Sequence, residues 1–587
     1  MIKKLLPYAK EYKWYTILAP LFIVCEVILE VSIPRIMANI VDIGIPNKNL
    51  NYITNMGILM IIMAVMSLFF GAMAARLSSI ASTGFAKEVR KGLFHKIQDF
   101  SFKNMDKFST ASLVTRLTTD VNHAQITFMM MIRMMIRAPL MFIMATFMSI
   151  SLNARLSTVI LIAIPILGIS LFVIAKNAYP KFRVMLEKYD KLNSVVQENL
   201  IAIRVVKAFV RSDYENEKFC DTANQVRETQ VRAERIVIWN WPIMQFVMYS
   251  CMLAVSWFGG NLIITGDMQP GELMGFISYI TQILVSLMMI AMAFVMFVIT
   301  RASLTRIREV FEEEVDIKEK SQDSISEVKD GSISFNNVSF SYLGNKDNLI
   351  LQNINFSINS GESIGIIGGT GSGKTTLVQL IPRLYDVTEG SIQVAGVDVK
   401  DYSLTHLRNA VAMVLQKNVL FSGTIRENLK WGNENASDDQ IIEACKAAQA
   451  HDFIMSFPDG YDTMLEQGGV NVSGGQKQRL CIARALLKSP KIIILDDSTS
   501  AVDTTTDSKI REALRSTDLF SKISKNLSAE KITTIIIAQR ITSVMDADRI
   551  IVMDDGKIVA IGTHESLLET NDIYREVYES QQKGVVA

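Results

Sequence analysis

The chain has 587 residues, a formal net charge of +1 and 49% hydrophobic residues. This length exceeds that of one ordinary domain, and the mean hydropathy of +0.25 is high for a wholly water-soluble protein. A net charge so close to zero gives no electrostatic reason to expect nucleic acid as a partner, and we expect none.

Six apolar segments in the first half of the chain are long enough to cross a bilayer, which takes about 20 residues of helix. They lie at about 14–42, 53–75, 128–152, 156–178, 237–264 and 273–300. The basic N-terminus runs directly into the first of them without the small-residue cleavage site of a signal peptide. We therefore interpret this first segment as a membrane span.

Positive charge alternates between the connections of these segments. Residues 1–13, 76–127 and 176–236 are rich in Lys and Arg, whereas the other connections are short and carry almost none. Because cytoplasmic loops carry the excess of Lys and Arg, the pattern predicts a polytopic domain of six transmembrane helices with both termini in the cytoplasm. We expect this domain to lie in the cytoplasmic membrane of a bacterium.

The two long basic connections are low in Gly and Pro, and "YDKLNSVVQENLIAIRVVKAFV" has apolar residues at helical spacing. We therefore expect the membrane helices to extend well into the cytoplasm. The turns near 107–116 and 207–214 are then expected to contact the part of the protein that lies on the cytoplasmic side of the membrane.

The composition changes after about Arg301, where a charged helical stretch leads into a linker. From Gly331 onward, strands such as "GESIGIIGG", "IIILDD" and "TTIIIAQR" alternate with helical patterns, which predicts an α/β domain with a largely parallel sheet. The expected organisation is a membrane domain at 1–310, a linker at 311–330 and a cytoplasmic domain at 331–587.

The octapeptide "GGTGSGKT" at 368–375 matches G-x-x-x-x-G-K-[ST] between a predicted strand and a predicted helix. In such a loop, backbone N–H groups surround phosphate oxygens, the lysine supplies positive charge, and the last hydroxyl ligates Mg²⁺. A glycine-rich turn that matches by chance would lack this strand and helix. The predicted nucleotide-binding residues are Gly368, Gly369, Thr370, Gly371, Ser372, Gly373, Lys374, Thr375 and Thr376.

Two further segments carry chemistry of the same kind. The apolar run "IIIL" ends in Asp496, and a carboxylate at a strand end near a phosphate loop holds Mg²⁺. The segment "NVSGGQKQR" places Ser473, Gly474, Gly475 and Gln476 just before a predicted helix, where N–H groups and a hydroxyl favour an anion. Local chemistry alone leaves an N-capped surface helix equally open for the second segment.

Together these motifs resemble the ATP-binding cassette (ABC) family, and within it the exporter half-transporters, which fuse six membrane helices to one α/β nucleotide-binding domain. The resemblance covers essentially the whole chain: the phosphate loop at 368–375, a signature VSGGQ at 472–476 where LSGGQ is usual, the Walker B strand at 492–496 and the D-loop SAVD at 500–503. It implies ATP and Mg²⁺ as ligands. It also implies that Tyr342 stacks on adenine and that Gln416 is the Q-loop glutamine that contacts the metal. Taken alone, Tyr342 is an ordinary sheet aromatic and Gln416 a solvated loop residue.

The resemblance further implies two cassettes packed head to tail, with each ATP between one phosphate loop and the opposite signature. Ser473, Gly474, Gly475, Gln476 and Asp503 of this chain would then complete the site of a partner subunit.

Two positions depart from the family pattern. Asp497 stands where the family has the glutamate that acts as general base, and Gln539 stands where it has the switch histidine. The aspartate is one methylene shorter, and a positional error of about 1 Å costs on the order of 100-fold in rate. We therefore expect a site that binds ATP and hydrolyses it poorly, in a heterodimer with a homologous half-transporter that carries Glu and His there. A homodimer with two slow sites is the alternative.

The first half gives partial indications of the transported compound. Methionines cluster at 129–137 and 287–297, which suits a surface for varied apolar ligands, although methionines that pack or face lipid look the same. Glu26 and Glu30 lie one turn apart in the first span and either bind cations or pair with Arg133 or Arg137. We expect ATP-driven export of hydrophobic or amphipathic compounds; lipid export, peptide export and an ATP-gated complex are alternatives.

Overall fold

The computed structural model describes residues 5–318, 325–342, 344–346, 348–498, 502–516, 523 and 531–586. Its internal contacts divide the chain into two compact units. The helical unit comprises Met1–Gln98 and Thr110–Glu313, and the α/β unit comprises Asp99–Ser109 and Glu314–Ala587. Residues 517–522 and 524–530, and the first two residues of SAVD, lie outside the described residues.

The helical unit contains six helices that are long and apolar enough to cross a membrane, which confirms the predicted spans. Helix α3 has 49 residues, or about 74 Å at 1.5 Å per residue, more than twice the thickness of a bilayer core at about 30 Å. The elements of this unit are η1 (Leu6–Tyr12), α2 (Lys13–Asn39), η2 (Ile40–Gly44), α3 (Leu50–Gln98), α5 (Thr110–Thr115), η3 (Arg116–Asp120), α6 (Val121–Leu152), α7 (Thr158–Ile201), α8 (Ile203–Ala208), α9 (Ser212–Val237), α10 (Asn240–Ile264) and α11 (Pro270–Glu312).

The second half of α3 carries its buried residues at spacings of three and four, as a helix with one packed face requires. They are Ala74, Leu77, Ser78, Ala81, Ser82, Gly84, Phe85, Ala86, Val89 and Leu93. Glycine at two positions on α3 admits tyrosines from η1. A Cβ at Gly84 would overlap the ring of Tyr12, and a Cβ at Gly92 would lie 2.6 Å from the ring of Tyr8.

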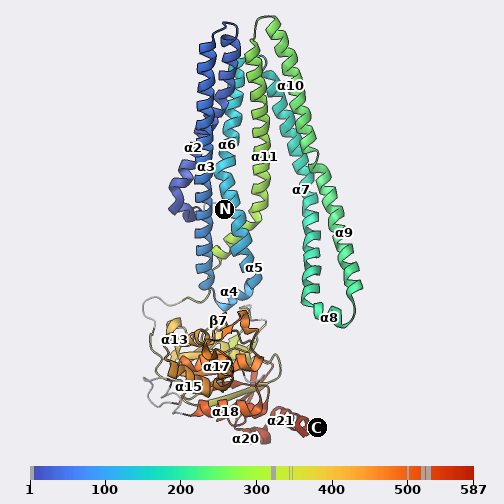
Figure 1. The fold of residues 1–587 in the computed structure, drawn as a ribbon. Coiled ribbons are helices and arrows are strands. Elements are labelled where there is room, and N and C mark those ends of the chain that lie inside the picture. Colours follow the sequence, from blue (N-terminus) through green and yellow to red (C-terminus); the bar gives the residue numbers. More distant parts are fainter. Residues whose placement is uncertain are drawn as a thin grey trace. The chain divides into compact units, whose positions relative to one another are not determined.

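Helices α7 and α9 lie side by side, joined by α8, and α10 continues the course of α9 (Figure 1). The ammonium of Lys218 on α9 contacts the carboxylate of Glu198 on α7 at 2.9 Å. At the tip of this pair, Ile201, Phe209 and Val210 are each more than 70% exposed. The predicted turn near 207–214 is therefore an apolar surface at the end of a long helical pair.

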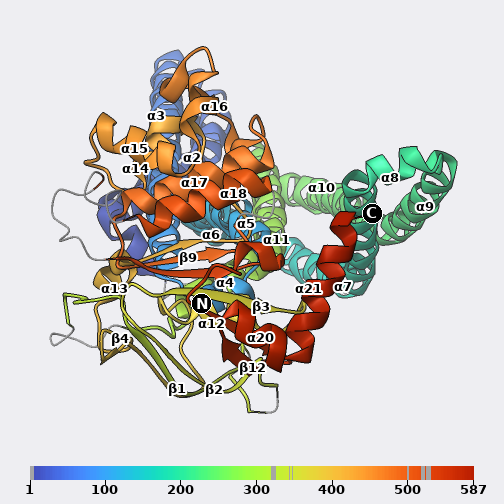
Figure 2. The same ribbon diagram turned by 90° about the horizontal axis from the view of Figure 1, so that it is seen from below.

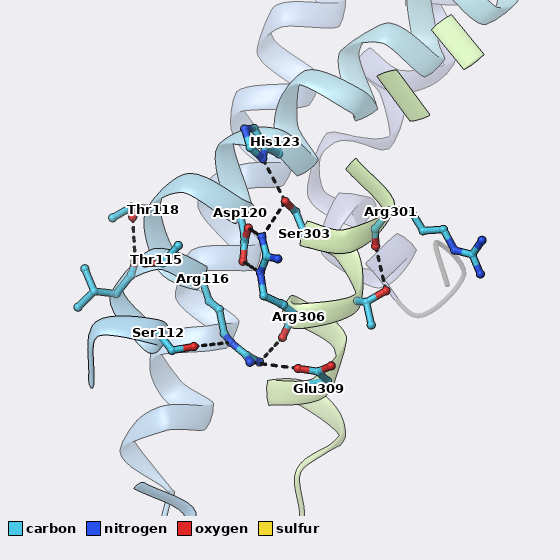
Figure 3. A network of polar contacts seen from close by, with 12 residues as sticks. Ser112, Thr115, Arg116, Thr118, Asp120, His123, Arg301, Ser303, Arg306 and Glu309 are labelled. Atoms are coloured by element: carbon cyan, nitrogen blue, oxygen red, sulfur yellow. Dashed lines mark hydrogen bonds and ion pairs between the residues drawn. The ribbon is translucent and has the colours of Figure 1, made fainter. Parts of the chain in front are cut away.

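An ion pair with a buried carboxylate joins η3, the turn that precedes α6, to α11 (Figure 3). Asp120 is fully buried, and its Oδ2 accepts a hydrogen bond from Arg306 Nε at 2.7 Å. Arg116 donates to the carbonyl of Arg306 at 2.6 Å and pairs with Glu309 at 3.0 Å. Asp120 and Arg116 are the two ends of η3, a π-helical turn, and such turns are frequent at functional positions. We call these four residues the α6–α11 clasp.

The two glutamates of the first span pair with an arginine in the structure. Arg137 on α6 contacts Glu26 at 2.9 Å and Glu30 at 2.8 Å. Gly71 on α3 leaves room for this group, since a Cβ there would lie 2.9 Å from Glu26 Oε1. Of the two readings that the sequence left open, pairing with Arg137 is the one found here.

The α/β unit is built around a six-stranded sheet in the order β12-β11-β3-β10-β9-β6, beside a four-stranded antiparallel sheet β2-β1-β4-β5. A two-stranded ribbon pairs β7 with β8. The elements are α4 (Phe102–Lys107), β1 (Ile333–Phe340), β2 (Leu351–Ile358), β3 (Ser363–Gly368), α12 (Lys374–Gln379), β4 (Glu389–Val394), β5 (Val397–Asp398), α13 (Leu404–Ala410), β6 (Val411–Val414), β7 (Gly423–Thr424), α14 (Ile425–Lys430), α15 (Asp438–Ala447), α16 (His451–Met455), η4 (Gly460–Asp462), β8 (Met464–Leu465), η5 (Gln467–Gly469), α17 (Gly474–Leu487), β9 (Ile492–Asp496), α18 (Thr504–Arg515), β10 (Thr533–Ile537), η6 (Ile541–Ser543), β11 (Arg549–Asp554), β12 (Lys557–Gly562), α20 (His564–Thr570) and α21 (Asp572–Val586).

The core strands are buried on both faces, which explains their continuous apolar runs. Side chains alternate along β9: Ile492 and Ile494 join the hydrophobic cluster on the side of the antiparallel sheet, whereas Ile493 and Leu495 join the cluster on the side of α15 and α17. Figure 2 shows these layers, with β1, β2 and β4 on one side of β3 and β9 and helices α15, α17 and α18 on the other. The parallel strands therefore end together at one edge, where the predicted site residues follow.

Candidate functional site

The phosphate loop connects β3 to α12. Its conformation requires glycine at two positions: Gly373 has φ +90° at the start of α12, and a Cβ at Gly368 would overlap the carbonyl oxygen of Met553 on β11. The ammonium of Lys374 donates hydrogen bonds to the carbonyls of Gly368 at 2.8 Å and Gly369 at 2.7 Å. The loop therefore folds around the lysine that the sequence predicts to contact phosphate.

Opposing influences act on the pKa of Lys374. Burial lowers the pKa of its ammonium, whereas the nearby carboxylates of Asp496 and Asp497 raise it. The ammonium of Lys374 therefore lies close to two carboxylates, whose negative charge stabilises its charged form.

Asp496 ends β9 beside the phosphate loop. Its Oδ1 accepts a hydrogen bond from the hydroxyl of Thr375 at 3.0 Å, and its Oδ2 is buried without a hydrogen-bond partner among the described residues. An unpartnered carboxylate oxygen next to a hydroxyl is the kind of oxygen ligand that Mg²⁺ prefers. These two residues therefore fit the metal that the sequence predicts, which would neutralise phosphate charge when bound.

The register of the sheet brings the two departures from the family pattern together. Asp496 on β9 lies opposite Ile537 on β10, so the residues just beyond them, Asp497 and Gln539, leave adjacent strands at the same edge. The amide Nε2 of Gln539 donates to Asp497 Oδ2 at 2.9 Å. The backbone at Asp497 has φ +48° and its N–H donates to the carbonyl of Ile537 at 3.0 Å.

Two amides engage the carboxylate of Asp497. Burial raises the pKa of this group, and hydrogen bonds from Gln416 and from Gln539 lower it. Gln416 follows β6, the strand next to β9, and it therefore reaches the site by the same edge of the sheet. The predicted metal contact of Gln416 remains a prediction, since its amide bonds to Asp497 here.

Tyr342 follows β1, and the residue is 37% exposed. Its hydroxyl forms a hydrogen bond with the hydroxyl of Thr376 at 2.9 Å, so the ring lies beside α12. It packs edge-on against Phe340 at 4.9 Å and against Tyr385 at 5.1 Å between ring centroids. An exposed aromatic face next to the phosphate loop is compatible with the predicted adenine contact.

The signature residues form a helix cap. Ser473 Oγ accepts from the N–H of Gln476 at 3.3 Å, and Gln476 Oε1 accepts from the N–H of Ser473 at 2.8 Å, which is a capping box for α17. Gly474 and Gly475 form the first turn, and the carbonyl of Gly475 accepts from Arg479. The capped helix that the sequence left open is therefore present, and the anion site at its start remains a prediction.

Asp503 also caps a helix. Its Oδ2 accepts from the N–H of Thr506 at 2.9 Å at the start of α18, and this hydrogen bond lowers the pKa of the carboxyl. The sequence interpretation left the capped helix at Ser473 open, but it did not anticipate the cap at Asp503 or the direct contact of Gln539 with Asp497. The pattern S-x-x-Q at 473–476 and the parallel strand register were the available signals.

The nearest downstream histidine has a different partner. His564 Nδ1 contacts the hydroxyl of Tyr574 at 2.7 Å, between α20 and α21. Because His564 is bonded to Tyr574, it does not replace the switch histidine that the family has at the position of Gln539.

Substituting Asp496 with Asn tests the metal assignment. We expect the variant to lower Mg²⁺-dependent ATP affinity by about 10-fold or more, because it removes the charge of a metal ligand. The affinity of the variant for ATP should differ little from that of the parent when a chelator has removed Mg²⁺. Titration of a fluorescent ATP analogue with and without Mg²⁺ measures both quantities. Asp554→Asn, an exposed change at the end of β11, is the control; equal losses in the two variants would contradict the assignment.

Comparison with known proteins agrees with this geometry. The description "ABC transporter transmembrane region" matches residues 16–288, "ABC transporter" matches 351–500 and "P-loop domain" matches 435–586. The ABC transporter ATP-binding protein YfiB of Bacillus subtilis (strain 168) is 39% identical over 99% of this chain and 98% of its own length.

Other relatives carry more specific names. The ATP-dependent lipid A-core flippase of Syntrophus aciditrophicus (strain SB) is 31% identical over 87% of this chain and 82% of its own. The putative multidrug export protein YgaD of Bacillus subtilis (strain 168) is 32% identical over 84% and 83%. A bacterial Atm1-family ABC exporter with ATP bound shares the fold, with a TM-score of 0.81, 23% identity and coverage of 97% and 99%. The chain therefore belongs to the ABC transporter family, as a half-transporter that joins a six-helix membrane domain to one ATP-binding cassette.

Proposed function

We propose that this half-transporter works in a heterodimer and that its own ATP site binds nucleotide but turns over slowly. The observation that carries the proposal is the 2.9 Å hydrogen bond from Gln539 to Asp497. The two residues that depart from the family pattern meet in one site, where the side-chain amide of Gln539 is hydrogen-bonded to the carboxylate of Asp497. A carboxylate held by amides is poorly placed to accept a proton from water, and glutamine cannot supply the charge of a histidine.

The partner in this proposal is a homologous half-transporter with Glu and His at the matching positions. This chain then contributes its signature to the partner's site, through the hydroxyl of Ser473, the N–H groups at the start of α17 and the cap at Asp503. Helix N-termini favour phosphate, and the capping box holds this one in a defined geometry. Most ATP turnover is then at the site built on the partner's Walker motifs.

We propose hydrophobic or amphipathic compounds as the transported class, moved out across the cytoplasmic membrane with both termini of the chain in the cytoplasm and the spans in contact with lipid. A cavity of about 390 Å³ between α6 and α11 supports this class, because methionines of the first cluster line it together with Phe294 and Phe297. The name of YgaD points the same way. The lipid flippase relative supports lipid as the second candidate.

Reconstitution of the full complex tests this function. Membranes should yield a second half-transporter with the expected Glu and His that co-purifies with this chain. Proteoliposomes should accumulate amphipathic compounds on addition of ATP, and the partner's glutamate should be required. Stimulation of ATP hydrolysis by a panel of drugs, lipids and peptides identifies the class. A stable homodimer with full turnover would contradict the heterodimer, and nucleotide-gated leakage without accumulation would contradict a pump.

Two serines with the same capping box separate the contact of Ser473 with phosphate from its role as a helix cap. Ser473→Ala should lower ATP hydrolysis by the complex on the order of 10-fold, because it removes a donor next to transferring phosphate. Ser437→Ala removes the cap of α15, which has the same capping box with Gln440, and should leave turnover within about twofold. Steady-state phosphate release measures both. Similar losses in both variants would show that capping alone explains the effect.

A further inference from the structure

Tyr385 lies in the turn after α12, where the backbone is held in a fixed shape. Arg383, two residues earlier, has φ +51° and is buried. Its guanidinium donates twice to the carboxylate of Asp386, at 2.7 and 3.1 Å. A bidentate pair that spans the tyrosine restricts the direction of its side chain, and Tyr385 itself is only 7% exposed.

One side of Tyr385 contacts helix α4, which belongs to the α/β unit. The tyrosine hydroxyl donates to Asp106 Oδ2 at 2.8 Å, and its ring lies 6.0 Å from that of Phe102. Two further hydrogen bonds attach the helix to the same unit, because Asn104 Nδ2 donates to the carbonyl of Glu314 at 3.0 Å and Ser101 bonds to Asp316. Along the chain, α4 stands between α3 and α5.

The other side of Tyr385 contacts the nucleotide site. Its ring meets Tyr342 edge-on at 5.1 Å with an interplanar angle of 84°, and both rings contact Phe340, at 5.7 Å and 4.9 Å respectively. Tyr342 in turn bonds to Thr376, next to the predicted Mg²⁺ ligand Thr375. Three rings in mutual contact permit little movement of one without the others.

We propose that Tyr385 is a positioning residue that couples nucleotide occupancy at Tyr342 to the position of α4. A base that stacks on Tyr342 fixes that ring, the ring fixes the edge of Tyr385, and the hydroxyl of Tyr385 holds α4 through Asp106. The proposal rests on the proposed adenine contact of Tyr342. Its sequence signal was weak, because Tyr385 belongs to none of the family motifs quoted above.

Full-length protein in lipid nanodiscs provides the test, with Cys25 and Cys220 replaced by Ser and an environment-sensitive fluorophore on Lys103→Cys in α4. ATP binding is followed by a nucleotide analogue and the response of α4 by the fluorophore. Tyr385→Phe keeps the ring and removes only the hydroxyl. We expect ATP affinity within about twofold of the parent and an α4 response reduced by on the order of 5-fold or more, the range of a typical coupling between sites.

Three comparisons make the result specific. Asp106→Ala should reproduce the loss of the α4 response, whereas Asp106→Asn keeps an acceptor and should retain most of it. Tyr402→Phe removes another tyrosyl hydrogen bond of this unit, to the carbonyl of Val394 at 3.0 Å, and should change neither readout. An undiminished response in Tyr385→Phe would overturn the proposal, and so would a joint loss of binding and response.

Tyr342→Ala distinguishes failure of the coupling from failure of the underlying assignment. A lowered ATP affinity in this variant supports the adenine contact. Unchanged affinity would contradict that contact and with it the starting point of the proposal. A lowered affinity combined with a normal α4 response in Tyr385→Phe would contradict the coupling alone.

Discussion

The double substitution D497E/Q539H is expected to raise ATP hydrolysis at this chain's own site by at least about 100-fold, the lower range of a general base's contribution. Either substitution alone is expected to restore little. In D497E the amide of Gln539 stays close enough to bond to the longer carboxylate. In Q539H the shorter carboxylate remains about one methylene from the family's position for the base.

The backbone adds to this expectation. Asp497 has φ +48°, a conformation in which Asp and Asn are enriched among residues other than glycine. A glutamate there loses that local preference, so its gain in reach is partly offset. The parallel pairing of β9 with β10 nevertheless keeps positions 497 and 539 adjacent, and the two changes should therefore act together.

The measurement requires that only the ATP site on this chain contributes to the phosphate that is released. In a complex whose partner carries Gln in place of its catalytic glutamate, single-turnover phosphate release isolates the site on this chain. Asp496→Asn added to the double variant is the control and should abolish the gain, because the metal ligand is lost. Full activity from D497E alone would show that Gln539 does not limit the site, which contradicts the two-defect argument.

Arg306→Ala is expected to destabilise the helical unit by about 3 kcal/mol, because it leaves the carboxylate of Asp120 buried without its partner. Asp120 is fully buried, whereas the side chain of Arg306 is 43% exposed. The reverse change, Asp120→Ala, leaves a guanidinium that can reach water and should cost less, about 1.5 kcal/mol. This asymmetry follows from burial and not from the pair's geometry, which both variants disrupt equally.

Thermal unfolding of the purified protein in lipid nanodiscs tests the order of the two effects. Arg306→Lys keeps a charge but loses the second hydrogen bond, and should be intermediate. Glu312→Ala is the control on the same helix, since it breaks a half-exposed pair with Arg308 at 3.2 Å and should cost less than about 1 kcal/mol. An Asp120→Ala variant less stable than Arg306→Ala would contradict the argument from burial.

Much of the architecture could be predicted because it depends on patterns local to the chain. The six spans follow from apolar length, and the α/β unit follows from strands buried on both faces, such as β9. The phosphate loop could be located because its glycines and lysine have roles that few other residues fill. Each of these signals lies within one short segment, so no long-range contact is needed to recognise it.

The rest depended on contacts between distant segments. The pairing of Arg137 with Glu26 joins residues 111 positions apart, and the bond between Tyr385 and Asp106 joins residues 279 apart. Asp99–Ser109 groups with the α/β unit because of contacts between segments that are distant in the sequence. At the candidate site, the identity of Asp497 and Gln539 could be read from the chain, but their hydrogen bond required the register of β9 and β10.

The α6–α11 clasp has a mechanical consequence. The chain passes between its two units at three peptide bonds: after Gln98, after Ser109 and after Glu313. The second crossing leads into η3 and the third leaves α11, and Asp120 with Arg306 ties these two segments together. A displacement that arrives through either of these two crossings is therefore shared by η3 and α11, whereas the first crossing follows α3, which packs against α2 and α6.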